Sequence, residues 1–236
     1  MTQPEAIPEH RKFAGVRAPL PLLPAEAERK LTARQREILD QLESLNLRAG
    51  FGDLTMAQLA KCVNCSLRTL YGLAPRKDEL VLMIVDRRLH RIGRAAMAAI
   101  APEMNPIEAL RAYLHAATTA LGPATVSLAR ELTAVAGAGR LINEHGNYVI
   151  AITQKLLDRA LEQGLIQPVD TSALALVLGG LGGYFSRPQI IPLIAATPKQ
   201  AADSITEIIL RGLEHEKGRS AIQNDPLAAP TEPVAT

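Results

Sequence analysis

Aromatic side chains are scarce in this chain of 236 residues, in which Trp is absent and the aromatic content is 3%. A packed interior must therefore be built from Leu, Ile, Val and Ala, a mix that favours helices. Hydrophobic residues make up 47% of the sequence. This is enough for the core of one large domain or two small ones.

Motifs of catalysis and of metal binding are also missing from the sequence. It contains no phosphate-binding glycine loop, no nucleophile elbow and no cluster of metal ligands. The G-G-x-G-G run from Gly179 to Gly183 lies in an apolar segment that we expect to be helical, rather than after a strand. His115 and His145 are too isolated in the sequence to indicate a metal site. The sequence therefore predicts that the protein is not an enzyme and has no cofactor and no metal.

Long hydrophobic runs are lacking as well. The most apolar run, Ala173 to Phe185, is interrupted by glycines and is shorter than the ~20 residues that span a bilayer, so we expect a buried helix. Prolines interrupt the first thirty residues and leave no continuous apolar core for a secretory signal. We therefore expect a cytoplasmic protein without a membrane segment.

Cysteine occurs twice, at Cys62 and Cys65, in a C-x-x-C spacing. Two thiolates fall short of the four ligands of a structural zinc site, and no neighbouring His supplies the others. Because a free Cys behaves as a small hydrophobic residue, we expect both to pack in the structure without forming a disulfide. A redox switch at this pair is the alternative.

Positive charge is concentrated in one part of the chain. The formal net charge is +2, yet residues 29–95 carry 13 Lys and Arg against 7 Asp and Glu, a net of +6. Residues 1–28 and 96–236 have net charges of −1 and −3. A basic segment of this kind suits contacts with nucleic-acid phosphates, because such contacts release bound counterions.

Two short helical patterns meet at a turn inside this basic segment. Thr55 and Gln58, three residues apart, form a capping box that predicts the start of the first helix. Asn64 tolerates the left-handed conformation of a sharp turn, and Ser66 can cap the second helix, in which Leu70 turns inward. The outer side of the second helix carries Leu67, Arg68, Thr69 and Tyr71. This is the arrangement of a recognition helix that enters a major groove of DNA.

The stretch resembles the DNA-binding domain of TetR-type transcriptional regulators. The family pattern reads T-V-x-x-I-A-x-x-A-G-V-S-x-x-T-L-Y, followed by K-E-E-L at the start of the next helix. The residues that match it without a gap are Thr55, Leu59, Ala60, Ser66, Thr69, Leu70, Tyr71, Lys77, Glu79 and Leu80. The resemblance covers residues 31–95 by motif, and the positions that depart from the pattern are Asn64, Cys65, Leu73 and Ala74.

The resemblance implies an all-α fold. An N-terminal three-helix DNA-binding domain with a helix-turn-helix would be joined by a long helix to a helical ligand-binding and dimerisation domain. Leu67 and Arg68 are predicted to contact bases, since Arg can pair with guanine in bidentate fashion and Leu can touch a thymine methyl group. The other predicted DNA-binding residues, suited mainly to phosphate contacts, are Thr55, Ser66, Thr69, Tyr71, Lys77 and, as a weaker member, Arg48.

Periodicity and capping patterns divide the chain into four parts. Residues 1–28 read as a flexible arm and residues 218–236 as a flexible polar tail. The DNA-binding domain spans 29–78 and opens with a capping box at Thr32 and Gln35. The effector-binding and dimerisation domain spans 79–217. After a long helix over 76–100, further helices are expected near 105–121, 123–134, 140–163, 171–186 and 198–217, which makes about nine helices in all.

The second domain is where the resemblance places a dimer interface and an effector pocket. The last two helices are expected to pack against their symmetry mates through Leu174, Val177, Gly180, Leu181, Ile205, Ile208, Ile209 and Leu213. The pocket candidates are polar or soft residues on otherwise apolar helices, namely Tyr113, His115, Thr118, Thr119, Asn147 and Tyr148. A pocket of this composition suits a small lipophilic effector.

The leading prediction is therefore a cytoplasmic homodimer that represses transcription from a palindromic operator in double-stranded DNA and is released by a small-molecule effector. Two alternatives stay open. One is a redox-sensing regulator that acts through Cys62 and Cys65. The other, motivated by Asn64 and Ala74, is a helical receptor or interaction protein that has lost specific DNA binding.

Overall fold

A computed structural model describes residues 13–51, 53–121, 132 and 134–214. These residues form nine α-helices and one 3-10 helix and include no strand, so the predicted all-α fold is confirmed. The elements are α2 (Ala25–Lys30), α3 (Ala33–Ala49), α4 (Met56–Cys62), α5 (Leu67–Leu73), α6 (Lys77–Ala98), α7 (Pro106–Leu121), α9 (Ala138–Glu162), α10 (Thr171–Phe185), η1 (Ile191–Leu193) and α11 (Pro198–Leu213). None of these helices is long and apolar enough to cross a membrane. The predicted tail and most of the helix predicted near 123–134 lie outside the described residues.

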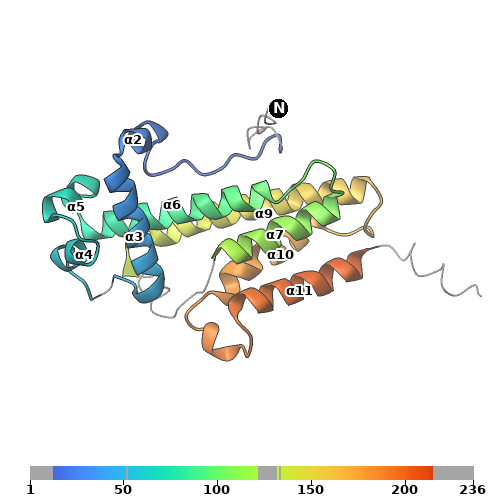
Figure 1. Cartoon of the computed structure of the whole chain (residues 1–236). Coiled ribbons are helices and arrows are strands. Elements are labelled where there is room, and N and C mark those ends of the chain that lie inside the picture. Colours follow the sequence, from blue (N-terminus) through green and yellow to red (C-terminus); the bar gives the residue numbers. More distant parts are fainter. Residues whose placement is uncertain (1–12, 52, 122–131, 133, 215–236) are drawn as a thin grey trace, which may run out of the picture.

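The helices gather at two ends of an elongated molecule (Figure 1). We call α3, α4, α5 and the first turns of α6, residues 33–85, the head. The body consists of the rest of α6 with α7, α9, α10 and α11. The long helices α6 and α9 lie side by side and run from the head through the body. Both therefore connect the two parts.

The head has its own hydrophobic core. Completely buried side chains from four different helices contribute to it, and they include Ile38, Leu42, Leu59, Leu70 and Leu80. Ile38 and Leu42 lie on the buried side of α3, which begins at the predicted capping box of Thr32 and Gln35. Burying such side chains stabilises the fold by about 1.5–3 kcal/mol each. This core fixes the short helices α4 and α5, which are too short to be stable alone.

The body encloses a second hydrophobic core, to which α7, α9, α10 and α11 all contribute. Leu110 and Leu157 are among its completely buried side chains. Gly179 on α10 allows a close crossing with α9, because a Cβ at this position would lie 3.0 Å from the Cα of Ile150. The apolar helix predicted to be buried is buried along one side only, since Leu176 and Val177 are exposed, and its packed side needs one glycine of the G-G-x-G-G run.

The segment predicted as a flexible arm is ordered in part. Phe13 is 3% exposed and lies under the guanidinium of Arg159, 4.8 Å from its ring centre. The backbone N–H of Leu22 donates a hydrogen bond of 2.8 Å to Oδ2 of Asp86 on α6. α2 begins at Ala25, within the predicted arm. These anchors are to residues far along the chain, so local composition does not reveal them.

Candidate nucleic-acid interface and effector sites

Both helices of the helix-turn-helix begin where the sequence predicts. Oγ1 of Thr55 accepts the backbone N–H of Gln58 at 3.3 Å, and Oε1 of Gln58 accepts the backbone N–H of Thr55 at 2.8 Å. At the start of α5, Oγ of Ser66 accepts the backbone N–H of Thr69 at 3.0 Å. The orphan amides at each helix start are thereby satisfied by local residues.

Asn64 closes the turn between α4 and α5 with φ at 48°, in the left-handed region. Asn tolerates this conformation, so it supplies the geometry that Gly provides in the family pattern. Arg34 on α3 donates hydrogen bonds to the carbonyl oxygens of Val63 at 3.2 Å and Asn64 at 2.7 Å. No local sequence pattern predicts this role of Arg34, because its partners lie 29 and 30 residues away.

The predicted recognition helix presents its outer side to solvent. Leu67 is 39% exposed and Tyr71 48% exposed, while Leu70 is completely buried. Arg68 is exposed between them, and Thr69 is half-buried. Because large apolar side chains are exposed beside a cation on one short helix, this face is suited to contact a partner.

The other predicted DNA-binding residues are spread around the same end of the molecule. Thr55 and Ser66 are exposed at the starts of α4 and α5, and Lys77 is the half-buried first residue of α6. Arg48 is exposed near the end of α3, on a groove of about 500 Å³ that Cys62 and other residues of the turn also line. Arg48 therefore lies on α3 beside the turn, and not on α5, the predicted recognition helix.

The two cysteines are free thiols. Cys65 is half-buried against the head core, but Cys62 is exposed, so the expectation that both pack is wrong for Cys62. Burial raises the pKa of the Cys65 thiol, against the opposing effect of the Arg34 charge. A raised pKa reduces the thiolate fraction, which is the reactive form, and so argues against a redox switch at this residue.

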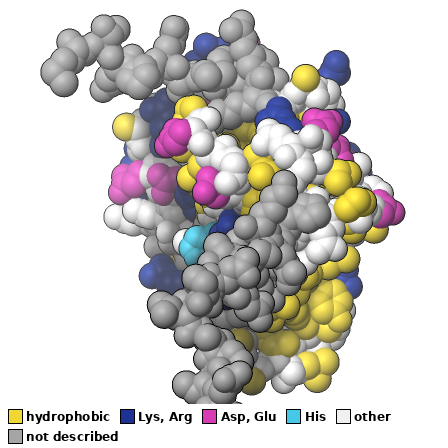
Figure 2. All heavy atoms as spheres, turned by 90° about the vertical axis from the view of Figure 1, so that its right-hand side faces the viewer, with side chains coloured by type: hydrophobic (Ala, Val, Ile, Leu, Met, Phe, Trp, Pro, Cys, Tyr) yellow, Lys and Arg dark blue, Asp and Glu magenta, His cyan; other side chains and the backbone are white. Residues whose placement is uncertain are grey.

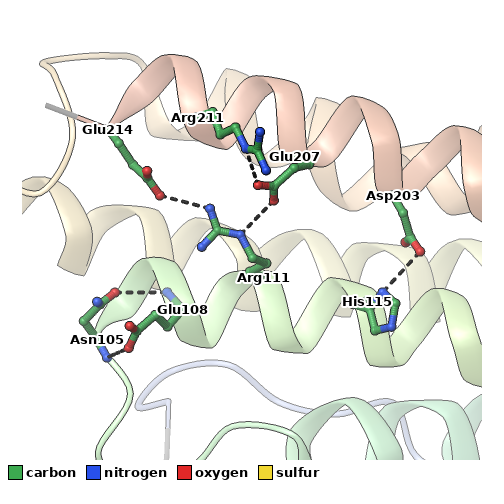
Figure 3. Close-up of polar contacts among 8 residues, drawn as sticks. All are labelled: Asn105, Glu108, Arg111, His115, Asp203, Glu207, Arg211 and Glu214. Carbon is green, nitrogen blue, oxygen red and sulfur yellow. Dashed lines mark hydrogen bonds and ion pairs between the residues drawn. The ribbon is translucent and has the colours of Figure 1, made fainter. Parts of the chain in front are cut away.

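The predicted effector residues are not gathered in one place. His115 and Thr118 converge on Asp203 of α11. Nδ1 of His115 lies 3.2 Å from Oδ2 of Asp203, as Figure 3 shows, and Oγ1 of Thr118 donates to Oδ1 of Asp203 at 2.7 Å. Tyr113 is completely buried in the body core. The remaining candidates are Thr119 and Asn147, which are exposed, and Tyr148, which is half-buried against that core.

A buried polar cluster that the sequence analysis missed lies where α6 and α9 meet. Oδ1 of Asp86 is 3.5 Å from Nε2 of His90, one turn along α6, and 3.3 Å from Nε2 of His145 on α9. A cavity of about 230 Å³ adjoins it, lined by Pro21, Leu23, Ala25, Glu28, Glu43, Asp86, Arg87, His90, Arg91 and Arg94. The sequence shows that Asp86 and His90 lie one helical turn apart. It does not show that His145, 59 residues from Asp86, joins them.

An exposed apolar face covers part of α10, η1 and α11. Its large exposed side chains are Leu176, Val177, Tyr184, Leu193 and Ile208. Figure 2 shows hydrophobic side chains gathered low on one face, the level at which Figure 1 places η1 and α11. Among the predicted dimer residues, Val177 and Ile208 lie on this face. Gly180 and Ile205 are half-buried, and the others, Leu174, Leu181, Ile209 and Leu213, pack against the body core.

Solved structures of TetR-family regulators share this fold. PfmR from Thermus thermophilus has 22% sequence identity and a TM-score of 0.56, and the match covers 75% of this chain and 99% of PfmR. A TetR-family regulator from Agrobacterium tumefaciens has 18% identity and a TM-score of 0.61, over 78% of this chain and 98% of that one. AibR, solved with isovaleryl coenzyme A and operator DNA, has 21% identity and a TM-score of 0.54. The match covers 74% of this chain and 97% of AibR. No family model and no curated protein matches the chain. At these identities the comparison establishes the fold predicted from the resemblance.

Proposed function

We propose that this protein is a dimeric transcriptional regulator that binds a palindromic DNA operator and responds to a small lipophilic effector. The observation that carries the proposal is the capped helix-turn-helix with an exposed outer side on α5, in the most basic part of the chain. A second helix of this kind, held by a short turn, is what places side chains against base edges in a major groove.

The predicted DNA-binding side chains of the head divide into two groups by their chemistry. Arg68 and Leu67 read the bases, through guanine acceptors and an apolar base edge such as a thymine methyl group. The others, Thr55, Ser66, Thr69, Tyr71, Lys77 and Arg48, hold the phosphate backbone through hydroxyl groups and cations. Leu70 supports both groups, because its complete burial anchors α5 to the head core.

The exposed apolar face of α10, η1 and α11 is the surface for a second copy of the chain. Val177 on α10 is 48% exposed and Ile208 on α11 is 70% exposed, on neighbouring helices that pack against each other. Two such helices from each copy form a four-helix interface, and a two-fold axis there gives the symmetry that a palindromic operator requires. Dimerisation would cover apolar surface that a monomer leaves in water.

Effector and operator binding are antagonistic in this proposal. The effector favours a state of the body in which α6 holds the two recognition helices at the wrong spacing for successive major grooves. AibR, which shares the fold, has been solved with both an acyl coenzyme A and operator DNA, which supports a fold able to combine the two kinds of ligand. Linkage then requires the operator to weaken effector binding by the same factor.

The test is selection of bound fragments from a randomised DNA library by the purified full chain. We expect one palindromic motif to be enriched, and Arg68→Ala to blur it at one position of each half-site. Lys77→Ala should weaken all sequences alike and reduce the salt dependence of binding. Lys155→Ala is the matched control, because Lys155 is an exposed lysine on α9 in the body. A folded dimer that enriches no motif would contradict the proposal and favour the interaction-protein alternative.

A further inference from the structure

We propose that Asp86, His90 and His145 form a binding site for a divalent transition-metal ion of the Zn²⁺ class. One carboxylate oxygen and one ring nitrogen from each histidine lie within 4.8 Å of one another. Two imidazoles and one carboxylate are a ligand set that proteins use for zinc with one coordination position left open. In the part of the chain that the structure describes, this is the one group of three or more such ligands.

The distances fit the coordination of such an ion. Zinc binds His nitrogen and carboxylate oxygen at ~2.0–2.2 Å, so ligand atoms at tetrahedral corners lie ~3.3–3.6 Å apart. Oδ1 of Asp86 is 3.3 Å from Nε2 of His145 and 3.5 Å from Nε2 of His90. All three ligand atoms lie within 4.8 Å of one another, and the two rings stand at 82° to each other with centres 4.7 Å apart.

Burial and a further hydrogen bond hold these ligands in place. The side chains of Asp86, His145 and His90 are 2%, 9% and 17% exposed. The backbone N–H of Leu22 donates to Oδ2 of Asp86, which leaves Oδ1 directed at the imidazoles. Support of this kind from surrounding residues is typical of ligating carboxylates and raises metal affinity.

Two of the neighbouring arginines, Arg87 and Arg91, are paired with other carboxylates, and Arg88 donates to the carbonyl oxygen of Leu121. Arg87 lies 3.2 Å from Asp40 and 3.7 Å from Glu28, and Arg91 pairs with Glu43. Their charges are thus partly neutralised before they can compete with a cation for Asp86. The adjoining cavity of about 230 Å³ has room for a water molecule or a small anion as the fourth ligand.

The position of the site gives it a regulatory role, which rests on the proposed function. Asp86 follows Val85, the last α6 residue that is buried in the head core, His90 lies one turn further on, and His145 lies one turn after Leu141, which packs in the same core. A bound ion would clamp α6 to α9 where the head meets the body. Metal loading would then change operator affinity, and operator binding would change metal affinity by the same factor.

The experiment measures Zn²⁺ affinity by competition with a chelating dye, and Co²⁺ coordination by its visible absorption, with the full chain carrying Cys62→Ser and Cys65→Ser. Those substitutions remove the thiolates. We expect about one ion per chain, and affinity lower by more than about 100-fold in His90→Gln, His145→Gln and Asp86→Asn. The matched control is His115→Gln, because His115 also contacts an aspartate at 3.2 Å but lacks a second histidine in its group. It should bind as the parent does.

Thermal unfolding in the presence of a chelator shows whether each variant folds without metal. His90 is the most exposed of the three ligands, so His90→Gln is the variant least expected to unfold. It decides the question if the other two variants are unfolded. Absence of binding by the parent chain, or equal affinity in parent and folded His90→Gln, would overturn the site. Unchanged operator affinity with and without Zn²⁺ would overturn its regulatory role alone. Failure to enrich any operator would overturn the proposed function and leave the metal titration interpretable.

Discussion

In the head, Leu67 and Leu70 lie three residues apart on one short helix, and one is 39% exposed while the other is completely buried. In the body, Val177 and Leu178 are adjacent on α10, and one is 48% exposed while the other is 2% exposed. The sequence around Leu67 explains the first difference, because caps and a turn fix the face of α5. Nothing local explains the second, since α10 is apolar on every side.

The comparison separates two ways of making a functional surface. Caps fix where helices begin in both regions, at Thr55 and Ser66 in the head and at Asp170 and Thr197 in the body, but on α5 polar side chains also mark the exposed side. The body sets its surface through packing, as at Gly179, where the approach of α9 decides which side of α10 is covered. In the head, substitutions on the buried side should therefore affect stability, and those on the exposed side should affect binding. In the body, substitutions test how closely the helices pack.

The largest effect is expected in the head, from Leu70→Ala. Removing this completely buried side chain should lower the free energy of unfolding by about 2–5 kcal/mol, because a cavity forms under α5. Leu67→Ala on the same helix should change it by no more than about 0.5 kcal/mol and yet weaken operator binding. Urea unfolding at one protein concentration measures the stability of both variants. It is followed by far-ultraviolet circular dichroism, since the chain has no Trp to serve as a fluorescent probe. Equal losses of stability would show that the two faces of α5 are not distinct.

In the body, Gly179→Ala tests whether close packing decides the arrangement. The added methyl group would lie 3.0 Å from the Cα of Ile150, and relieving this clash should cost about 1–3 kcal/mol despite the gain in helix propensity. Gly93→Ala is the control, because no described atom lies within 4 Å of its Cβ position in the middle of α6. That variant should be more stable by up to about 1 kcal/mol. If Gly179→Ala were also stabilising, α9 and α10 would have to be free to separate.

The same distinction explains what the sequence could predict. The starts of α4 and α5, the burial of Leu70 and the turn at Asn64 follow from residues within a few positions of each other. Asp86 and His145 are 59 residues apart, and their proximity depends on how α6 packs against α9. Tyr113 was selected for a pocket by residue type, but the face of α7 that packs inward buries it completely. The burial and the partners of a side chain that contacts other helices cannot be predicted from a local sequence pattern.

A smaller effect is expected from removing a cap in the head. Thr55→Ala deletes the oxygen that accepts the backbone N–H of Gln58 and should cost about 1 kcal/mol. Thr119→Ala is the control in the body, because Thr119 is exposed within α7 and caps no helix. It should leave stability the same or slightly raise it, through helix propensity. Chemical unfolding of both variants measures the difference, and a larger loss from Thr119→Ala would contradict the importance of local capping.

The smallest effect is expected from the ion pairs between α7 and α11 in the body. Glu207 accepts hydrogen bonds from Arg211 at 2.6 Å and from Arg111 at 2.8 Å, and Arg111 also reaches Glu214 at 3.0 Å (Figure 3). The bond from Arg211 and then that from Arg111 lower the pKa of Glu207 below its usual 4.5. Because Glu207 is 33% exposed, Glu207→Gln should cost only about 0.2–1 kcal/mol at neutral pH.

The pH dependence gives this small effect a definite sign. The pKa of Glu207 is lower in the folded state than in the unfolded state, so its stabilisation is fully present above about pH 4.5 and is lost as the pH falls through the folded pKa. The difference in unfolding free energy between the parent and Glu207→Gln should therefore be constant near neutral pH and shrink below pH 4.5. Glu144→Gln, which affects an exposed pair within α9, is the control for a local ion pair. A difference that grew as the pH fell would mean that the surroundings of Glu207 destabilise its charged form, and would contradict a stabilising role for its ion pairs.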